Sequence, residues 1–182
     1  MPTLLDGDFK ELFKKPPASV LAYFREKGLR GPDSHWDWSD TMRHAHDRAF
    51  TVAKATSLDI VRDIRDSLTT AIQEGQSFQS WRRGIVPTLQ AKGWWGKQMV
   101  TDPRTGEETM SQLGSTRRME TIYRTNMATA YEAGHHSAQM EVVDDMPYWR
   151  YVARAPGKNR RPDHQALHNI VKRWDDPFWA SH

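Results

Sequence analysis

One apolar stripe at helical spacing, between residues 115 and 142, constrains the fold of this chain most strongly. Its members are Met119, Ile122, Tyr123, Met127, Ala130, Tyr131, Gly134 and Ala138. Steps of three and four residues place such side chains on one buried face of an α-helix. The pattern predicts one long helix, whose small residues form a smooth side that another element can approach closely.

Polar residues interrupt this stripe at Arg124, Thr125 and Asn126. Polar residues within an apolar helix face tend to mark a functional or structurally strained site. A buried donor left unpaired costs about 1–3 kcal/mol, and a charged one costs more. Arg124 and Asn126 near a core would therefore need carboxylate or carbonyl partners, and the candidate carboxylates lie toward the C-terminus.

The composition is that of a folded, water-soluble protein. Of the 182 residues, 37% are hydrophobic and 27% are charged, so a core can form. The mean hydropathy of -0.80 implies a thin core beneath much solvated helix surface. No apolar run reaches the roughly 20 residues of a membrane span, so we expect no membrane partner. Asp6 and Asp8 stand where a secretory signal would be basic and then apolar, which predicts a cytosolic protein.

The absence of cysteine excludes disulfides and thiolate metal sites in these residues. His164 and His168 are spaced to share one helix face, but two ligands are too few for a metal site. No nucleophile elbow and no glycine-rich phosphate loop is present. We therefore predict no metal, no cofactor, no small-molecule substrate and no catalytic residue.

The predicted fold class is α+β and helix-dominated, with one compact domain from about residue 38. An N-terminal arm spans 1–37 and carries a short amphipathic segment, 19–27. An antiparallel helical layer spans 38–93, with helices starting at Ser39, after Ser57 and at Ser77. The first of these helices would place Met42, Ala45, Ala49 and Ala53 on one face.

Residues 94–114 are predicted to form a projecting β-hairpin, because two short polar strands flank a turn-rich sequence that contains Gly106. Residues 115–182 hold the long helix and a small C-terminal module. In that module the period changes to two after Pro147, which predicts a strand from Tyr148. A short helix from Pro162 and a second strand at 170–174 follow.

Basic residues concentrate near the C-terminus, with seven between positions 150 and 173 against the single acid Asp163. They are Arg150, Arg154, Lys158, Arg160, Arg161, Lys172 and Arg173. Such a stripe can bind phosphates, as can a second basic group of Arg82, Arg83, Lys92 and Lys97, so double-stranded DNA is a second candidate partner. A metal-dependent nuclease would use Asp163 and His164 among these arginines, and such a nuclease or toxin-like domain is a third interpretation.

Tryptophan and phenylalanine at the ends of elements are candidates for protein contacts, because an exposed aromatic side chain at an edge is a common interface anchor. The better candidates are Trp94 and Trp95 before the hairpin, and Phe178 and Trp179 at the C-terminus. Anchoring of the core is the alternative role for most of the eight tryptophans.

Several separated motifs resemble one known family, the phage Mu F-like minor head proteins, also described as the phage head morphogenesis family. The motifs are Ala45-His46-Asp47-Arg48-Ala49-Phe50, Ile122-Tyr123-Arg124-Thr125-Asn126, Ala130-Tyr131-Glu132-Ala133-Gly134, Pro147-Tyr148, Arg161-Pro162-Asp163-His164 and Asp175-Asp176-Pro177-Phe178-Trp179. Their common order from residue 45 to residue 179 makes coincidence improbable.

The resemblance implies a minor capsid protein with no enzyme activity, made in the host cytoplasm and then carried in the virion head. Implied partners are the portal and other phage head proteins, and the implied roles are head assembly and DNA packaging or delivery. In relatives a cysteine-containing segment follows the Asp-Asp-Pro-Phe-Trp motif. Because this chain ends at His182, we expect it to be a shortened form.

The motif residues also suggest a structural polar cluster that clamps the C-terminal module to the long helix. Its members are Arg124, Asn126, Asp163, His164, Asp175 and Asp176. Hydrogen bonds to a charged partner contribute about 1.5–3 kcal/mol each, so such a cluster would stabilise the module. Loss of the arginine is then expected to lower the melting temperature.

Overall fold

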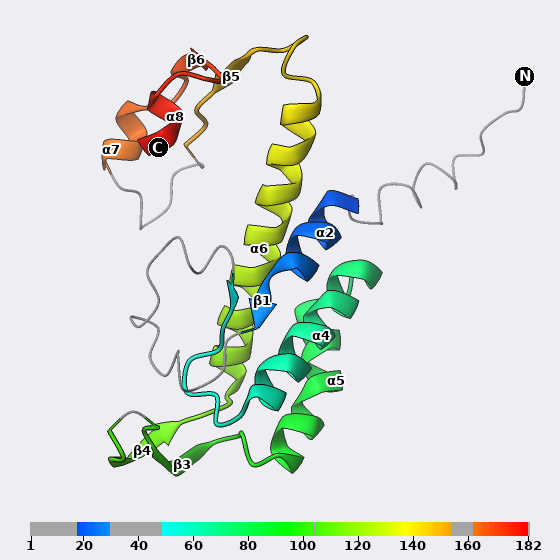
Figure 1. Cartoon of the computed structure of the whole chain (residues 1–182), viewed down its shortest axis with the longest axis vertical. Helices are drawn as coiled ribbons and strands as arrows, with labels where there is room; N and C mark the ends of the chain where they lie inside the picture. Colours follow the sequence, from blue (N-terminus) through cyan, green and yellow to red (C-terminus); the bar gives the residue numbers. More distant parts are fainter. Residues whose placement is uncertain (1–17, 30–48, 104, 154–161, 182) are drawn as a thin grey trace, which may run out of the picture. The chain divides into compact units, whose positions relative to one another are not determined.

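The computed structural model of the chain describes residues 18–29, 49–103, 105–153 and 162–181. The chain divides into two compact units, Met1–His135 and His136–His182. The longest helix, α6 (Thr116–Glu141, 26 residues), crosses the boundary between the units. The fold is α+β and helix-dominated, as the sequence predicted (Figure 1).

Helix α4 (Leu58–Glu74) begins and ends where the sequence predicted. The Ser57 side chain accepts a hydrogen bond from the Ile60 amide at 3.4 Å, which satisfies one free donor of the first turn. Gly75 ends the helix with φ of 64°, a left-handed conformation that favours glycine.

Helix α5 (Phe78–Ala91) runs back along α4 after a short connection (Figure 1). Ser77 caps it, and the helix continues through Pro87. The Trp81 indole joins the two helices, because its Nε1 donates to Ser67 Oγ at 2.9 Å while the ring is buried. The antiparallel helical layer predicted from the sequence is therefore present in α4 and α5.

The predicted β-hairpin is also present. Strand β3 (Lys97–Thr101) pairs antiparallel with β4 (Glu108–Gln112). Gly106 in the connection has φ of 73°, as a turn that needs a left-handed residue requires. Met99 lies opposite Met110, and both side chains are exposed, while Val100 faces the core.

The helix predicted from Ser39 through Ala53 is wrong in its described part. Residues 49–50 form strand β2 (Ala49–Phe50), which pairs in parallel with β1 (Gly28–Leu29), and residues 39–48 lie outside the described residues. The Phe50 ring meets Phe24 edge to face, with 5.7 Å between ring centroids. This long-range aromatic contact and the pairing with β1 fix the segment as a strand.

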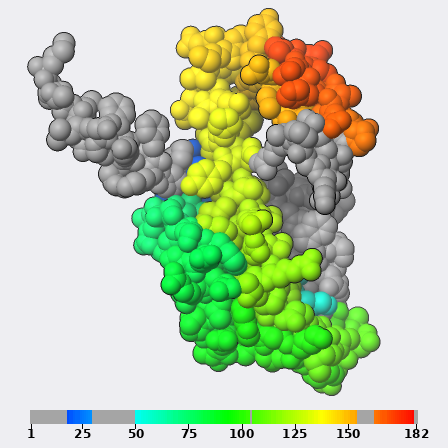
Figure 2. All heavy atoms as spheres, turned by 180° about the vertical axis from the view of Figure 1, so that it is seen from behind, coloured from blue at the N-terminus to red at the C-terminus, as the bar shows by residue number. Residues whose placement is uncertain are grey.

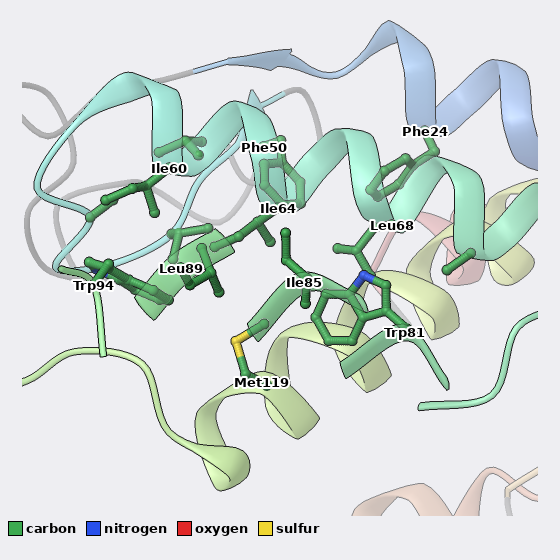
Figure 3. Packing of buried hydrophobic residues seen from close by; sticks show 14 of the residues in the cluster. Phe24, Phe50, Ile60, Ile64, Leu68, Trp81, Ile85, Leu89, Trp94 and Met119 are labelled. Atoms are coloured by element: carbon green, nitrogen blue, oxygen red, sulfur yellow. The ribbon is translucent and has the colours of Figure 1, made fainter. Parts of the chain in front are cut away.

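The core of the first unit lies between α4, α5 and the first part of α6 (Figure 3). Helix α2 (Ala18–Glu26) adds Val20 and Phe24 to it. In Figure 3, Ile64 and Leu68 of α4 point toward Ile85 and Trp81 of α5. The apolar part of the predicted arm, 19–27, therefore packs on the body of the same chain.

The stripe on α6 is confirmed for most of its members. Met119, Ala130 and Gly134 are buried, and Ile122, Tyr123 and Met127 are partly buried against the core. A Cβ added at Gly134 would lie 2.3 Å from Val20 Cγ2, so α2 approaches this glycine closely, as the small residues predicted. Tyr131 and Ala138 are exposed, so their assignment to the buried face was wrong.

The second unit is a small α/β module. Strands β5 (Tyr148–Arg150) and β6 (Val171–Arg173) pair antiparallel. Helix α7 (Pro162–Ala166) lies between them in the sequence, and α8 (Phe178–Ser181) follows β6. Both strands and α7 were predicted. Among the described residues, no helix combines the length and the apolar character that crossing a bilayer requires.

Candidate interaction surface

The second unit is organised around a cluster of aromatic rings that meet edge to face on one side of the β5–β6 ribbon. Trp149 of β5 meets Trp179 of α8 edge to face at 5.8 Å, and Phe178 lies 4.9 Å from Trp179. Tyr151 meets Phe178 at 6.1 Å. The Trp179 indole Nε1 also donates to the Arg173 carbonyl at 2.8 Å, which ties α8 to β6.

The opposite side of this ribbon is exposed and combines apolar side chains with arginines. Tyr148, Val152 and Val171 are 68%, 61% and 55% exposed. In the register, Tyr148 lies opposite Arg173 and Arg150 lies opposite Val171, so aromatic or aliphatic residues alternate with arginines across the strands. We call this set of Tyr148, Arg150, Val152, Val171 and Arg173 the outer ribbon face. Exposed aromatic and aliphatic side chains next to arginine are typical of surfaces that bind other proteins.

Two histidines hold the segments next to the ribbon. His164 Nδ1 and the Tyr151 hydroxyl are hydrogen-bonded, and their rings stack at 6.2 Å. His168 Nδ1 accepts a hydrogen bond from the Ala153 amide at 3.2 Å. Each imidazole therefore has a structural contact inside the second unit. In the described part of the chain, no three His, Asp or Glu side chains come together in a way that could hold a metal ion.

Four of the six residues proposed for the clamp, Arg124, Asn126, Asp175 and Asp176, have a contact close in sequence. Arg124 pairs with Glu120 on its own helix at 2.7 Å, and its side chain is 76% exposed, so it does not lie in the core as the stripe suggested. Asn126 Nδ2 donates to the Ile122 carbonyl at 2.8 Å. Asp175 pairs with Arg173 at 3.1 Å.

Asp176 has two roles in its own segment. It pairs with Lys172 at 3.5 Å, and its Oδ1 accepts from the Phe178 amide at 2.9 Å, which caps α8. Asp163 is exposed in the first turn of α7. The clamp between the long helix and these carboxylates stays a prediction.

The basic stripe is only partly described. Lys172 and Arg173 each have a carboxylate partner, which reduces the positive charge they offer to a phosphate. Arg150 has no such partner among the residues that the structure describes. Arg154, Lys158, Arg160 and Arg161 lie outside the described residues.

The four aromatic candidates for interface anchors differ in burial. Trp94 is fully buried, its Nε1 donates to the Lys54 carbonyl at 2.7 Å, and it therefore serves the core rather than an interface. Trp95 is half-buried, and its ring would lie 2.4 Å from a Cβ at Gly114. Phe178 and Trp179 are half-buried within the aromatic cluster of the second unit.

The arginine that the structure does place against the core is Arg118, which sequence reasoning missed. Its guanidinium donates to the carbonyls of Gln112 at 2.6 Å, Leu113 at 3.2 Å and Ala53, and it lies 5.4 Å above the Trp94 ring. Burial lowers the pKa of Arg118 from its usual range, although an arginine remains charged. Its neighbour Arg117 is exposed. In the sequence, Arg118 differs from Arg117 only in lying four residues before Ile122, on the side of the helix that carries the apolar stripe.

Comparisons with known proteins agree with the motifs in the sequence. The family model described as "Phage Mu protein F like protein" matches residues 62–182. The "Putative capsid assembly protein F" of Escherichia phage Mu is 44% identical over 167 residues, covering 92% of this chain and 37% of that protein. The "Mu-like prophage FluMu F protein" of Haemophilus influenzae is 44% identical over 146 residues, covering 80% of this chain and 34% of that protein.

The chain thus spans about a third of the length of these curated relatives. No solved structure matches it. The extent of the family match and the identity over most of the chain confirm the resemblance seen in the motifs, and the chain belongs to the phage Mu protein F-like family.

Proposed function

We propose that this chain acts in phage head assembly as a noncatalytic component that binds other head proteins. The observation that carries the proposal is its 44% identity, over 92% of its length, to a protein named as a putative capsid assembly protein. Identity at this level over so much of the chain supports a shared role for this region of the protein.

The outer ribbon face is the surface best suited to such a contact. Its apolar side chains Tyr148, Val152 and Val171 are more than half exposed, although burying one such side chain stabilises by about 1.5–3 kcal/mol. No residue of the second unit is classed as fully buried in the part that the structure describes. A partner that covers this face would therefore bury apolar area that the chain itself leaves exposed.

At a finer level, we propose that the protein is a minor component of the head, present near the portal. It would be made in the host cytoplasm and then retained in the virion head. The portal and other head proteins are its proposed partners, and DNA packaging or delivery is the process it would serve.

Substitution of Tyr148 by serine in the phage tests the proposal. Loss of one anchoring side chain at an interface costs about 2 kcal/mol or more, so the amount of the protein in purified heads should fall by roughly tenfold or more. Quantitative mass spectrometry of purified heads measures this. Tyr131→Ser is the matched control, because Tyr131 is also exposed but lies on α6 in the first unit. Normal incorporation of Tyr148→Ser, or an equal loss for the control, would contradict the assignment of the outer ribbon face.

DNA binding through the basic stripe is the second candidate function. The exposure of Arg150, which has no carboxylate partner in the described part of the chain, favours it. Gel shifts of the purified chain on duplex DNA, at several salt concentrations, distinguish it from the first candidate. Incubation of DNA with the chain, with and without Mg²⁺, tests the nuclease interpretation built on Asp163 and His164.

A further inference from the structure

A depression between α5 and α6 is lined by arginines that the proposed head contact through the outer ribbon face does not use. Its volume is about 760 Å³. The residues that line it are Ser77, Phe78, Gln79, Arg82, Arg83, Glu120 and Arg124. A second depression, of about 300 Å³, shares Arg82 and Arg83 and continues toward Trp95 and Thr116. Figure 2 shows the surfaces of α5 (green) and of the first half of α6 (lime) side by side.

The charge in this groove is positive and only partly compensated. Glu120 is the one acid of the lining, and it is paired with Arg124 at 2.7 Å. Neither Arg82 nor Arg83 has a carboxylate within ion-pair distance in the described part of the chain. Two guanidinium groups are therefore available to an anion.

Contacts with neighbouring residues hold both arginines in place. The Arg82 guanidinium lies 5.8 Å from the centre of the Phe78 ring, and its Nη1 donates to Thr116 Oγ1 at 3.2 Å. Arg83 Nε donates to the Gln79 carbonyl at 3.4 Å. A guanidinium has five N–H donors, so most of them stay free for a ligand while the group is already oriented.

We infer that this groove binds an acidic, extended segment of a partner protein. Two oriented guanidinium groups suit two carboxylates, each held by a bidentate pair, and Phe78 in the lining offers an apolar contact beside Arg82. Duplex DNA fits less well, because its affinity comes from about 6–10 phosphate contacts and the groove has only two uncompensated cations. The inference rests on the proposed function, since a head-assembly protein needs protein partners.

A fluorescein-labelled decapeptide of alternating glutamate and serine is the probe, and fluorescence anisotropy with the full chain measures its binding. We expect saturable binding that weakens as salt is added. Arg83→Glu should weaken it by at least about tenfold, because one bidentate ion pair is replaced by a repulsion. Arg83→Gln should weaken peptide binding by about threefold or more, because it removes the ion pair. This neutral variant separates the loss of the ion pair from the repulsion that glutamate adds.

Arg117→Glu is the matched control, because Arg117 is exposed on α6 and changes the net charge equally without lining the groove. The affinity of this variant for the peptide should stay within about twofold of the wild-type affinity, because solvent and salt largely screen an exposed charge that does not contact the peptide. Equal peptide binding by the wild type and Arg83→Glu would overturn the inference. So would a 30-base-pair duplex that displaces the peptide and loses affinity in the same variant, because the groove would then be a nucleic-acid site.

Failure of the groove and failure of the proposed function give different results. If the chain does not bind the peptide but its incorporation into heads depends on Tyr148, only the inference about the groove is refuted. A chain that binds the peptide through Arg83 but never enters heads refutes only the role in head assembly.

Discussion

At the residue scale, Arg118 is the polar side chain that joins the hairpin to the helical core. It bonds three backbone carbonyls that come from two separate segments, near Ala53 and at Gln112–Leu113. Arg118→Ala should lower the free energy of unfolding by about 2–4 kcal/mol, because these carbonyls lose their donors. Urea denaturation followed by circular dichroism measures it.

Arg117→Ala is the control for Arg118, since it removes the neighbouring, exposed arginine and should change stability by no more than about 0.5 kcal/mol. Arg118→Lys should recover only part of the loss, because one ammonium group cannot reach all three carbonyls. Equal stability of Arg118→Ala and Arg117→Ala would show that the buried contacts contribute nothing.

Tyr123 gives the fold a dependence on alkaline pH. Its hydroxyl donates to the Gln76 carbonyl at 2.5 Å, and burial, followed by the neighbouring Tyr131, raises its pKa above the ordinary value of 10.0. The unfolded chain then loses the phenolic proton at a lower pH than the folded chain. The stabilisation is complete below about pH 10 and decreases as the pH rises above that value.

Tyr123→Phe should cost about 0.5–1.5 kcal/mol at pH 7, because it removes the hydrogen bond to Gln76. It should also reduce the loss of stability above about pH 10. Denaturation curves at pH 7 and at pH 10.5 test both effects. A variant that keeps the full alkaline loss would show that other groups cause it.

At the element scale, the close approach of α2 to α6 depends on the missing side chain at Gly134. A methyl group there would meet Val20 Cγ2 at 2.3 Å and the Val20 amide nitrogen at 3.3 Å, so the helix would have to move. Gly134→Ala should destabilise the fold by about 1–3 kcal/mol and increase amide hydrogen exchange in α2. Denaturation and hydrogen exchange measure these effects.

Gly84 of α5 is the matched glycine, since nothing lies within 4 Å of a Cβ built there. Gly84→Ala should stabilise the chain by about 0.5–1 kcal/mol, because alanine favours the helix and has room for its methyl group. Equal destabilisation by Gly84→Ala and Gly134→Ala would show that the loss at Gly134 does not come from its close contact with Val20.

At the scale of the whole molecule, stability measurements can distinguish the proposed clamp, between the long helix and the carboxylates near the C-terminus, from the Arg124–Glu120 ion pair within α6. The exposed Arg124–Glu120 pair alone contributes about 0.3–0.5 kcal/mol, so Arg124→Ala should cost no more than that without a clamp. A clamp predicts a larger fall in stability, and a coupling of about 1 kcal/mol or more between Arg124→Ala and Asp175→Asn in a double-mutant cycle. Zero coupling would contradict the clamp.

The local elements could be predicted from the sequence because their signals lie within a few residues of one another. Ser57, Ser77 and Gly75 set the ends of α4 and α5, and the alternation after Pro147 set β5. The exposed face of α6 was less predictable, since Tyr131 has the spacing and the apolar character of a buried residue but lies outside the contact with α2, α4 and α5.

The sequence by itself determined α4, α5, α6, the hairpin and the family, because caps, periodicity and ordered motifs are properties of neighbouring residues. Only the tertiary structure decided that Ala49–Phe50 forms a strand beside Gly28–Leu29, and that Arg118 is half-buried against the core while Arg124 is exposed. Each of these outcomes depends on which distant surfaces meet. Burial and long-range pairing are set by the free energy of those contacts, which no local pattern encodes.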